Sequence, residues 1–251
     1  MQKFSLFFNK AKVNPFWRGH FFLFDKPQLI TYTPQQGFRL LVIFIFLEAI
    51  IRPLSLFCSR QLNIGNYNWW SIVNMTILTF LFFLLIKNFA RVKTAELGLY
   101  SWRQWTKTEK LYLLQIIPVT IIIFSVFNAA GLKVLWSRPN SSEIVLLTLI
   151  PQMIWGFYQE LLYRGILQTE LVRRWGAPKG ILASNFIFTF GPLHAYHFLA
   201  VRHNPSHLLI FVAIFCIGLF FSIVFNRSGN LWIIGIMHGL GDLFIEGLAK
   251  V

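Results

Sequence analysis

The chain is poor in charged residues and in cysteine, and both shortages narrow its class. Only 13% of its 251 residues are charged, about half the share found in soluble domains. The two cysteines, Cys58 and Cys216, are too few and too far apart for a disulfide framework or a thiolate zinc site. The composition therefore argues against a soluble globular domain and leaves the cysteines without an assigned role.

The residues that are abundant are apolar, aromatic and basic. Hydrophobic residues make up 56% of the chain and aromatic residues 18%, yet the formal net charge is +14. A nucleic-acid-binding protein would gather its basic residues on a polar face, so we expect no nucleic-acid partner. The combination instead fits a membrane protein whose basic residues lie in short loops.

Seven stretches are long and apolar enough to cross a bilayer, which takes about 20 residues. They are residues 38–58, 69–87, 111–131, 144–166, 180–200, 207–226 and 230–249. The sequence therefore predicts an all-α, polytopic integral membrane bundle of about seven transmembrane helices. A count of six or eight spans stays open. The reason is the basic, aromatic segment 14–30, which is not counted as a span and could lie in the membrane interface.

The distribution of basic residues predicts the orientation of the chain. Most Lys and Arg residues fall before residue 38, between residues 88 and 110, and between residues 167 and 179. The segments on the other side hold only Arg60, Lys133, Arg138, Arg202 and Lys250. The excess of basic residues on the cytoplasmic side of membrane proteins then predicts a cytoplasmic N-terminus.

Three of the last four spans carry a pair of residues four positions apart, which share one helix face. The pairs are Glu160 with Arg164, Phe190 with His194, and His238 with Asp242. An ionisable group at mid-membrane costs about 2.5–3.5 kcal/mol. One such pair alone would be an ordinary structural contact, but three on separate helices predict a polar cavity inside the bundle.

Neighbouring residues add detail to this prediction. Pro192 should bend the fifth span between Phe190 and His194. Gly235, Gly239 and Gly241 leave the last helix slim, so another helix can approach it closely. In the first span, Glu48 and Arg52 are also four positions apart, and we interpret them as a neutralising pair; a role in steering substrate is the alternative.

Most intramembrane protease chemistries are excluded by the residues that the chain lacks. The His-Glu-x-x-His string of zinc enzymes is absent, and no serine has the context of a nucleophile. An aspartyl dyad is also excluded, because Asp25 in the N-terminal segment is the only aspartate besides Asp242. The chemistry that remains uses a carboxylate and a histidine to activate water, with polar groups stabilising the oxyanion.

The three pairs resemble the motifs of the glutamate-type intramembrane endopeptidases of the CAAX-protease and bacteriocin-processing (CPBP) family. Those motifs are Glu-Glu-x-x-x-Arg, Phe-x-x-x-His and His-x-x-x-Asn or Asp, on successive membrane helices. The chain offers Gln159-Glu160-Leu-Leu-Tyr163-Arg164, Phe190-Gly-Pro-Leu-His194 and His238-Gly-Leu-Gly-Asp242. The resemblance covers about residues 145–245 and implies a four-helix protease-like core over 144–251. The composition and the predicted spans add a basic, aromatic N-terminal segment (1–36) and three N-terminal transmembrane helices (37–143), which show only hydrophobicity.

The resemblance also implies a role for each residue of the motifs. The general base belongs to the first position of the first motif, with His194 as its partner. His238 and Asp242 would stabilise the oxyanion, and Glu160 would pair with Arg164. Tyr163 and Phe190 would support these groups. No cofactor or metal is implied; zinc held by His194, His197, His238 and Glu160 is a weaker alternative.

The implied activity is hydrolysis of a peptide bond near the membrane-embedded or C-terminal end of a protein. The partners would be membrane lipid and a protein or peptide substrate with an apolar or lipidated end. The oligomeric state, the substrate and any need for prenylation stay open.

One residue departs from the family pattern, because the first glutamate of the motif is Gln159 here. A glutamine side chain has no basic carboxylate and cannot take a proton from water. Three interpretations stay open: a catalytically inactive scaffold or substrate-binding protein, an enzyme in which Glu160 or His194 is the base, or a glutamate-to-glutamine change introduced to inactivate an enzyme. A transporter is the weakest alternative, since no inverted repeat is evident.

Overall fold

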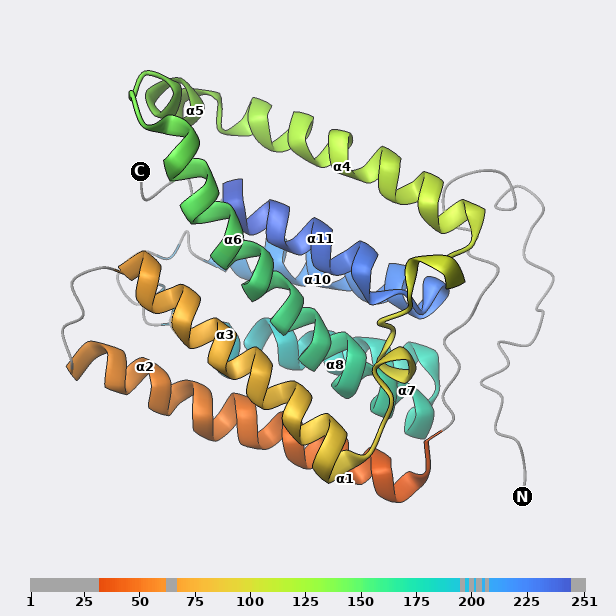
Figure 1. Cartoon of the computed structure of the whole chain (residues 1–251). Coiled ribbons are helices and arrows are strands. Elements are labelled where there is room, and N and C mark those ends of the chain that lie inside the picture. The colour runs from red at the N-terminus through yellow and green to blue at the C-terminus, as the bar shows by residue number, and fades with distance from the viewer. Residues whose placement is uncertain are drawn as a thin grey trace.

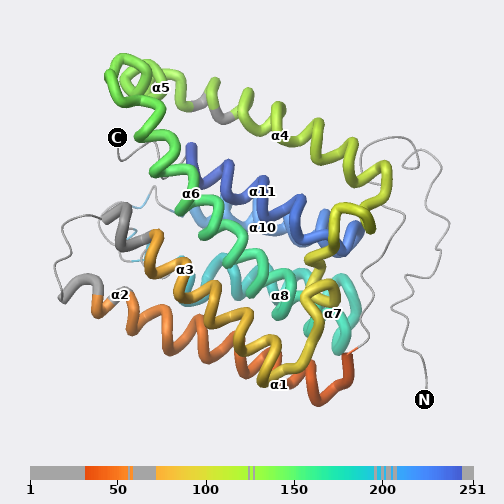
Figure 2. The backbone as a smooth tube through the Cα atoms, in the orientation of Figure 1, coloured from red at the N-terminus to blue at the C-terminus, as the bar shows by residue number. Residues whose placement is uncertain are grey.

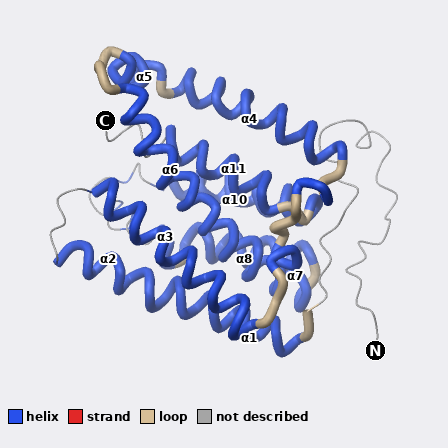
Figure 3. The backbone as a smooth tube through the Cα atoms, viewed as in Figure 1, coloured by secondary structure: helices blue, strands red, loops and turns tan. Residues whose placement is uncertain are grey.

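The computed structural model describes residues 32–61, 67–194, 197–198, 201, 205 and 208–244. These residues form helices joined by short loops, with no strand among them (Figure 3). The predicted all-α class is therefore confirmed for the described part of the chain. The interfacial segment predicted at 14–30 lies outside it.

Ten α-helices of 7 to 21 residues make up most of the described chain. They are α1 (Pro34–Ile45), α2 (Arg52–Gln61), α3 (Tyr67–Leu85), α4 (Lys107–Phe127), α5 (Ala129–Trp136), α6 (Ser141–Glu160), α7 (Thr169–Trp175), α8 (Ala177–Phe190), α10 (Leu208–Ser228) and α11 (Leu231–Asp242). Short 3-10 turns lie at η4 (Thr94–Leu97), η5 (Trp102–Gln104) and η7 (Pro192–His194).

Three π-helical segments continue neighbouring α-helices, and such widened turns are frequent at functional sites. They are η2 (Phe46–Ile51), η3 (Ile86–Ala90) and η6 (Leu161–Gln168). Segment η2 joins α1 to α2, and η6 joins α6 to α7, so each of these sets forms one continuous helix. Segment η2 contains Glu48, and η6 directly follows Glu160, so each is next to an acidic residue of a predicted pair.

Three helices among the described residues are long and apolar enough to cross a membrane, judged by length and composition. They are Ile72–Ala90, Ser141–Trp175 and Leu208–Ser228. They coincide with three of the expected spans, and the total of seven stays a prediction. The expected span 111–131 is divided at Asn128, where α4 ends and α5 begins after it.

Helix α6 lies at the centre of the arrangement (Figures 1 and 2). It contacts α3 on one side and α11 on the other, and α4 lies beyond α11. Helices α8 and α10 pack against each other, and both contact the π-helical segment η6. The first motif of the predicted site, which ends in η6, is therefore enclosed by helices from both halves of the chain.

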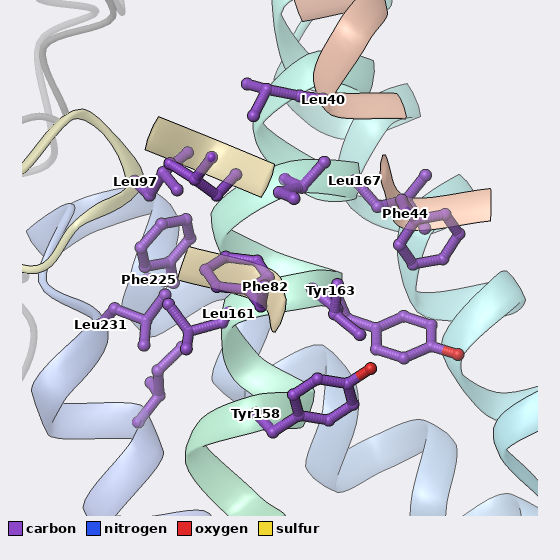
Figure 4. Packing of buried hydrophobic residues seen from close by; sticks show 14 of the residues in the cluster. Leu40, Phe44, Phe82, Leu97, Tyr158, Leu161, Tyr163, Leu167, Phe225 and Leu231 are labelled. Atoms are coloured by element: carbon purple, nitrogen blue, oxygen red, sulfur yellow. The ribbon is translucent and has the colours of Figure 1, made fainter. Parts of the chain in front are cut away.

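One hydrophobic cluster joins these helices. Its most deeply buried members come from α1 with η2, α3 with η3, η4, α6 with η6, α10 and α11. Figure 4 labels among them Leu40, Phe82, Leu97, Tyr158, Leu161, Tyr163, Phe225 and Leu231. The cluster contains residues from before and after residue 144, where the protease-like core was expected to begin. The N-terminal helices thus form one side of the packing around α6.

Side-chain caps and turns fix where two of the helices begin. Thr33 and Gln36 form a reciprocal capping box before α1, with Pro34 at the first helical position. Asn230 caps α11, since its Oδ1 accepts from Trp232 N at 3.1 Å. The Asn230 amide also donates to the buried carboxylate of Glu109 at 3.1 Å. This bond ties the start of α11 to α4.

Helices α6 and α11 approach each other at two glycines, as the slim last helix predicted. A Cβ atom placed on Gly156 would lie 2.5 Å from Gly239 N and 2.8 Å from Gly239 Cα. A Cβ on Gly239 would lie 2.8 Å from Met153 Cα. Since the obstructing atoms are backbone, no side-chain rotation can relieve the overlap.

Replacing Gly156 by alanine should therefore force α6 and α11 apart. We expect Gly156→Ala to lower the free energy of unfolding by about 3 kcal/mol, the upper part of the range for overpacked sites. Unfolding midpoints in detergent micelles measure this. Gly131→Ala is the matched control, because nothing lies within 4 Å of a Cβ there. Equal midpoints for the two variants would contradict the close approach.

Candidate active site

The first motif lies where α6 widens into η6. Gln159 and Glu160 are the last two residues of α6, and Tyr163 and Arg164 lie in η6. All four side chains are buried, with Glu160 fully so. The sequence thus places a glutamine, a carboxylate, a phenol and a guanidinium in the interior of the bundle within six residues.

Glu160 and His238 form the central contact of the site. His238 Nδ1 lies 2.6 Å from Glu160 Oε1, and Arg164 Nη1 donates to the same oxygen at 3.2 Å. On the other side of the imidazole, Nε2 lies 3.6 Å from Asp242 Oδ2. The predicted pairings of Glu160 with Arg164 and of His238 with Asp242 are confirmed, and the Glu160–His238 bond joins them into one cluster.

Arg164 is held by groups from three other positions. Its Nη2 donates to the carbonyl oxygen of Gly218 at 2.9 Å, and its guanidinium lies 4.1 Å from the Phe188 ring centroid. A Cβ on Gly218 would lie 3.1 Å from Arg164 Nη2 and would overlap the Asn185 side chain. The glycine in α10 therefore allows the buried guanidinium to reach the backbone.

The second motif does not lie on a continuous helix, so the prediction of a bent span over 180–200 is wrong. Helix α8 ends at Phe190, Gly191 is extended, and Pro192 to His194 form a 3-10 turn. Proline lacks an N–H donor and disfavours helical geometry in the preceding residue, so the helix stops where a bend was expected. Phe190 and His194 consequently do not share a helix face.

The end of α8 positions the His194 ring. Its Nδ1 lies 2.7 Å from the carbonyl oxygen of Phe188. Because a carbonyl oxygen only accepts hydrogen bonds, Nδ1 is the donor, and the Nε2 lone pair of the neutral ring remains available as an acceptor. A histidine fixed in this tautomer can accept a hydrogen bond from water.

Phe188 is a site residue that the sequence did not reveal. Its ring centroid lies 5.0 Å from that of His194, 6.1 Å from that of His238 and 5.1 Å from that of Tyr163, besides its contact with Arg164. Phe188 thus separates and supports the groups of all three motifs. As one of 28 phenylalanines, it carried no distinguishing signal.

Phe190, the phenylalanine of the second motif, lies to one side of this cluster. Its ring stacks on Phe211 with centroids 5.5 Å apart and also contacts Phe198 and Phe186. Its side chain is partly exposed. The structure therefore gives Phe190 a packing role beside α10.

Gln159 contributes a buried polar group of a different kind. Its Oε1 atom is buried and has no hydrogen-bond partner among the described residues. The hydroxyl of the neighbouring Tyr158 is likewise buried without such a partner. Figure 4 shows the Tyr158 and Tyr163 hydroxyls pointing to the same side of the helix. Position 159, where the family motif has a glutamate, is therefore a buried position with a polar side chain.

A second polar cluster reaches the site from the first helix. Arg52 Nη1 donates to Glu48 Oε2 at 2.9 Å, which confirms the predicted pair. Tyr163 Oη donates to the same carboxylate oxygen at 2.9 Å. Arg52 Nη2 also donates to the carbonyl oxygen of Leu193 at 3.2 Å. The pair therefore contacts the first motif and the turn that carries His194, which the i,i+4 spacing alone did not show.

No metal site emerges from the part of the chain that the structure describes. No group of three or more His, Cys, Asp or Glu residues there could hold a metal ion. The His197 ring stacks at 5.8 Å on His194, and His203 and His207 lie outside the described residues. The alternative of a zinc ion held by His194, His197, His238 and Glu160 thus gains no support from the geometry.

Comparison with known proteins identifies a family for the region that holds the three motifs. Residues 140–244 match the family model described as type II CAAX prenyl endopeptidase Rce1-like. The matched region runs from the start of α6 to the end of the described chain, and it includes every residue of the three motifs but not Glu48 or Arg52. No curated protein and no solved structure matches the chain.

Proposed function

Because residues 140–244 of this chain belong to the Rce1-like family of type II CAAX prenyl endopeptidases, we propose that the chain is an intramembrane endopeptidase. The observation that carries the proposal is the buried Glu160–His238 contact, flanked by Arg164 and Asp242. Such a cluster is costly in an apolar interior, and a hydrolytic site explains it. The chain would cross the membrane several times, with its N-terminus in the cytoplasm.

The substrate would be a protein or peptide cleaved near its membrane-embedded or C-terminal end. The family description names prenyl endopeptidases, which supports a substrate with an apolar or lipidated end. The lipid-facing side chains of α3, α4 and α10 include many exposed large apolar residues, such as Phe80, Leu114 and Leu209. These surfaces fit a protein that meets its substrate within the bilayer.

In the proposed reaction the two histidines act on different atoms. His194 accepts a hydrogen bond from the attacking water through Nε2, because its Nδ1 is engaged by the Phe188 carbonyl. His238 would stabilise the oxyanion through Nε2–H as an imidazolium. That charge, with Arg164, balances the two carboxylates of Glu160 and Asp242. A preorganised donor of this kind is worth about 100- to 1000-fold in rate.

Glu160 orients His238 in this scheme. Its Oε1 already accepts from both His238 and Arg164, so this oxygen holds the imidazole in place. The proton from water must go to a carboxylate elsewhere or to Glu160 Oε2, because Gln159 cannot accept it. The second candidate function, a non-catalytic scaffold that binds a substrate tail or partner helix, is favoured by Gln159 alone.

A reconstitution experiment distinguishes the two functions. The chain and its Gln159→Glu variant are placed in liposomes with a library of membrane-anchored and prenylated C-terminal peptides, and products are read by mass spectrometry. We expect both forms to cleave, with Gln159→Glu at least as fast. Cleavage by the variant alone would make position 159 the base, and binding of the same peptide without cleavage by either form would establish the scaffold.

A further inference from the structure

Arg52 and Glu48 contact the residues one turn before and one turn after Gln159, which are Trp155 and Tyr163. Trp155, Gln159 and Tyr163 are spaced four residues apart and share one stripe of the helix. The Arg52 guanidinium lies 4.8 Å from the Trp155 ring centroid, and Tyr163 Oη donates to Glu48 Oε2 at 2.9 Å. Gln159 lies one turn from Trp155 and one turn from Tyr163, so helical spacing places it on the face of α6 that meets the Glu48–Arg52 pair.

Glu160 faces a different way. Successive residues of an α-helix are rotated by about 100°, and Glu160 accordingly meets His238 and Arg164. The carboxylate of Glu160 is therefore directed to one side of α6, whereas the carboxylate of Glu48, from η2, contacts another side through Tyr163. Glu160 serves the His238 side, and Glu48 serves the side on which the family glutamate would lie.

One of the two carboxylate oxygens of Glu48 accepts no hydrogen bond from the described residues. Its Oε2 accepts from Arg52 and Tyr163, whereas its buried Oε1 has no hydrogen-bond partner among the described residues. Gln159 Oε1 is likewise buried without a hydrogen-bond partner among the described residues. The two oxygen atoms are both acceptors and cannot bond to each other, but a water molecule can donate one hydrogen to each. The arrangement suits a bound water that has a carboxylate as its neighbour.

The same pair also fixes the turn that carries His194. Segment η2 lies against η7, and Arg52 Nη2 donates to the carbonyl oxygen of Leu193, the residue before His194. Arg52 also compensates the negative charge of Glu48, so the carboxylate can be buried in its ionised, proton-accepting form. These contacts thus bring Glu48 close to the turn that carries His194 and to the face of α6 on which helical spacing places Gln159.

We propose, on the basis of the peptidase function above, that Glu48 is the general base of this chain and replaces the carboxylate that position 159 lacks. One water proton passes to Glu48 Oε1 while the water oxygen adds to the peptide carbonyl carbon. The carbon–nitrogen bond then breaks, and the proton passes to the departing amine nitrogen. Glu48 returns to its ionised form, and one amine and one carboxylic acid product leave.

Moving the carboxylate between the two positions tests this proposal. Four forms are compared in liposomes: the chain itself, Glu48→Gln, Gln159→Glu and the double variant Glu48→Gln/Gln159→Glu. We expect Glu48→Gln to lower the cleavage rate by about 100- to 10,000-fold, the usual contribution of a general base. The double variant should recover to within about tenfold of the chain itself, because the carboxylate then faces the same water from the α6 side.

Two further variants separate catalysis from folding. Glu48→Asp keeps the charge beside Arg52 but withdraws the carboxylate by one methylene, so kcat should fall with little change in KM or in the unfolding midpoint. Glu143→Gln, an exposed acidic residue in the first turn of α6, is the matched control and should cleave normally.

Each result decides the proposal. Normal cleavage by Glu48→Gln would overturn it while leaving the peptidase function in place. An inactive double variant beside an active Gln159→Glu would also overturn it, because Glu48 would then be needed for structure. Failure of all forms to cleave would overturn the peptidase function itself, and the role of Glu48 with it.

Discussion

Replacing His238 by glutamine should lower the cleavage rate by about 100- to 1000-fold, the cost of losing one preorganised oxyanion donor. The imidazole contacts both Glu160 and Asp242, at 2.6 Å and 3.6 Å. A glutamine amide can still donate to Glu160, so the fold should persist. It cannot present a second N–H beside Asp242 in the same geometry. The loss should therefore appear in kcat.

The measurement is single-turnover cleavage of the best peptide from the liposome library, made in whichever form of the chain cleaves. His194→Ala in parallel should also abolish cleavage, through loss of water activation. Met237→Ala, the neighbouring position on α11, is the control and should retain activity. Cleavage within threefold of the parent by the double variant His194→Ala/His238→Ala would show that the active site lies elsewhere.

The parts of this site that the sequence predicted are the ones fixed by local helix geometry. Glu160 with Arg164, His238 with Asp242, and Glu48 with Arg52 are all separated by four residues, and each pair is in contact. Within an unbroken helix, a spacing of four places two residues on one face, however that helix packs against the others. For the same reason the slim face of α11 could be predicted from its glycines.

The contacts between helices could not be predicted in this way. The Glu160–His238 bond joins residues 78 positions apart, and the Tyr163–Glu48 bond joins residues 115 positions apart. Which faces of two helices meet depends on their crossing angle and on where the backbones can approach. The close approach at Gly156 decides that α6 presents Glu160 to α11, and no spacing within either helix encodes it.

The end of α8 shows a second kind of limit. Proline inside an apolar run is compatible with a kinked helix or with a helix that stops. The sequence around Pro192 favoured the kink, but the structure has the stop at Phe190. That difference matters chemically, because the freed carbonyl of Phe188 becomes the acceptor that fixes the His194 tautomer.

The largest stability effect should come from Arg164. Its guanidinium is fully buried, bonded to Glu160 and to the Gly218 carbonyl, and stacked on Phe188. Arg164→Met keeps the apolar length of the side chain and removes the charge, so Glu160 loses the guanidinium that pairs with it. Removing one partner of a buried ion pair costs about 3–5 kcal/mol, and we expect that loss in the free energy of unfolding in detergent micelles.

A double-variant cycle separates the lost charge balance from the lost packing. Glu160→Gln/Arg164→Met removes both charges, so it should be more stable than Arg164→Met alone, since breaking a buried pair costs more than replacing it. Arg174→Met is the control, because Arg174 pairs with Glu170 while partly exposed, and exposed pairs contribute about 0–1 kcal/mol. If Arg164→Met is as stable as Arg174→Met, the buried cluster does not hold α6 to α10. Glu160 would then need another source of charge balance, and His238 as an imidazolium would be the remaining group in contact with it.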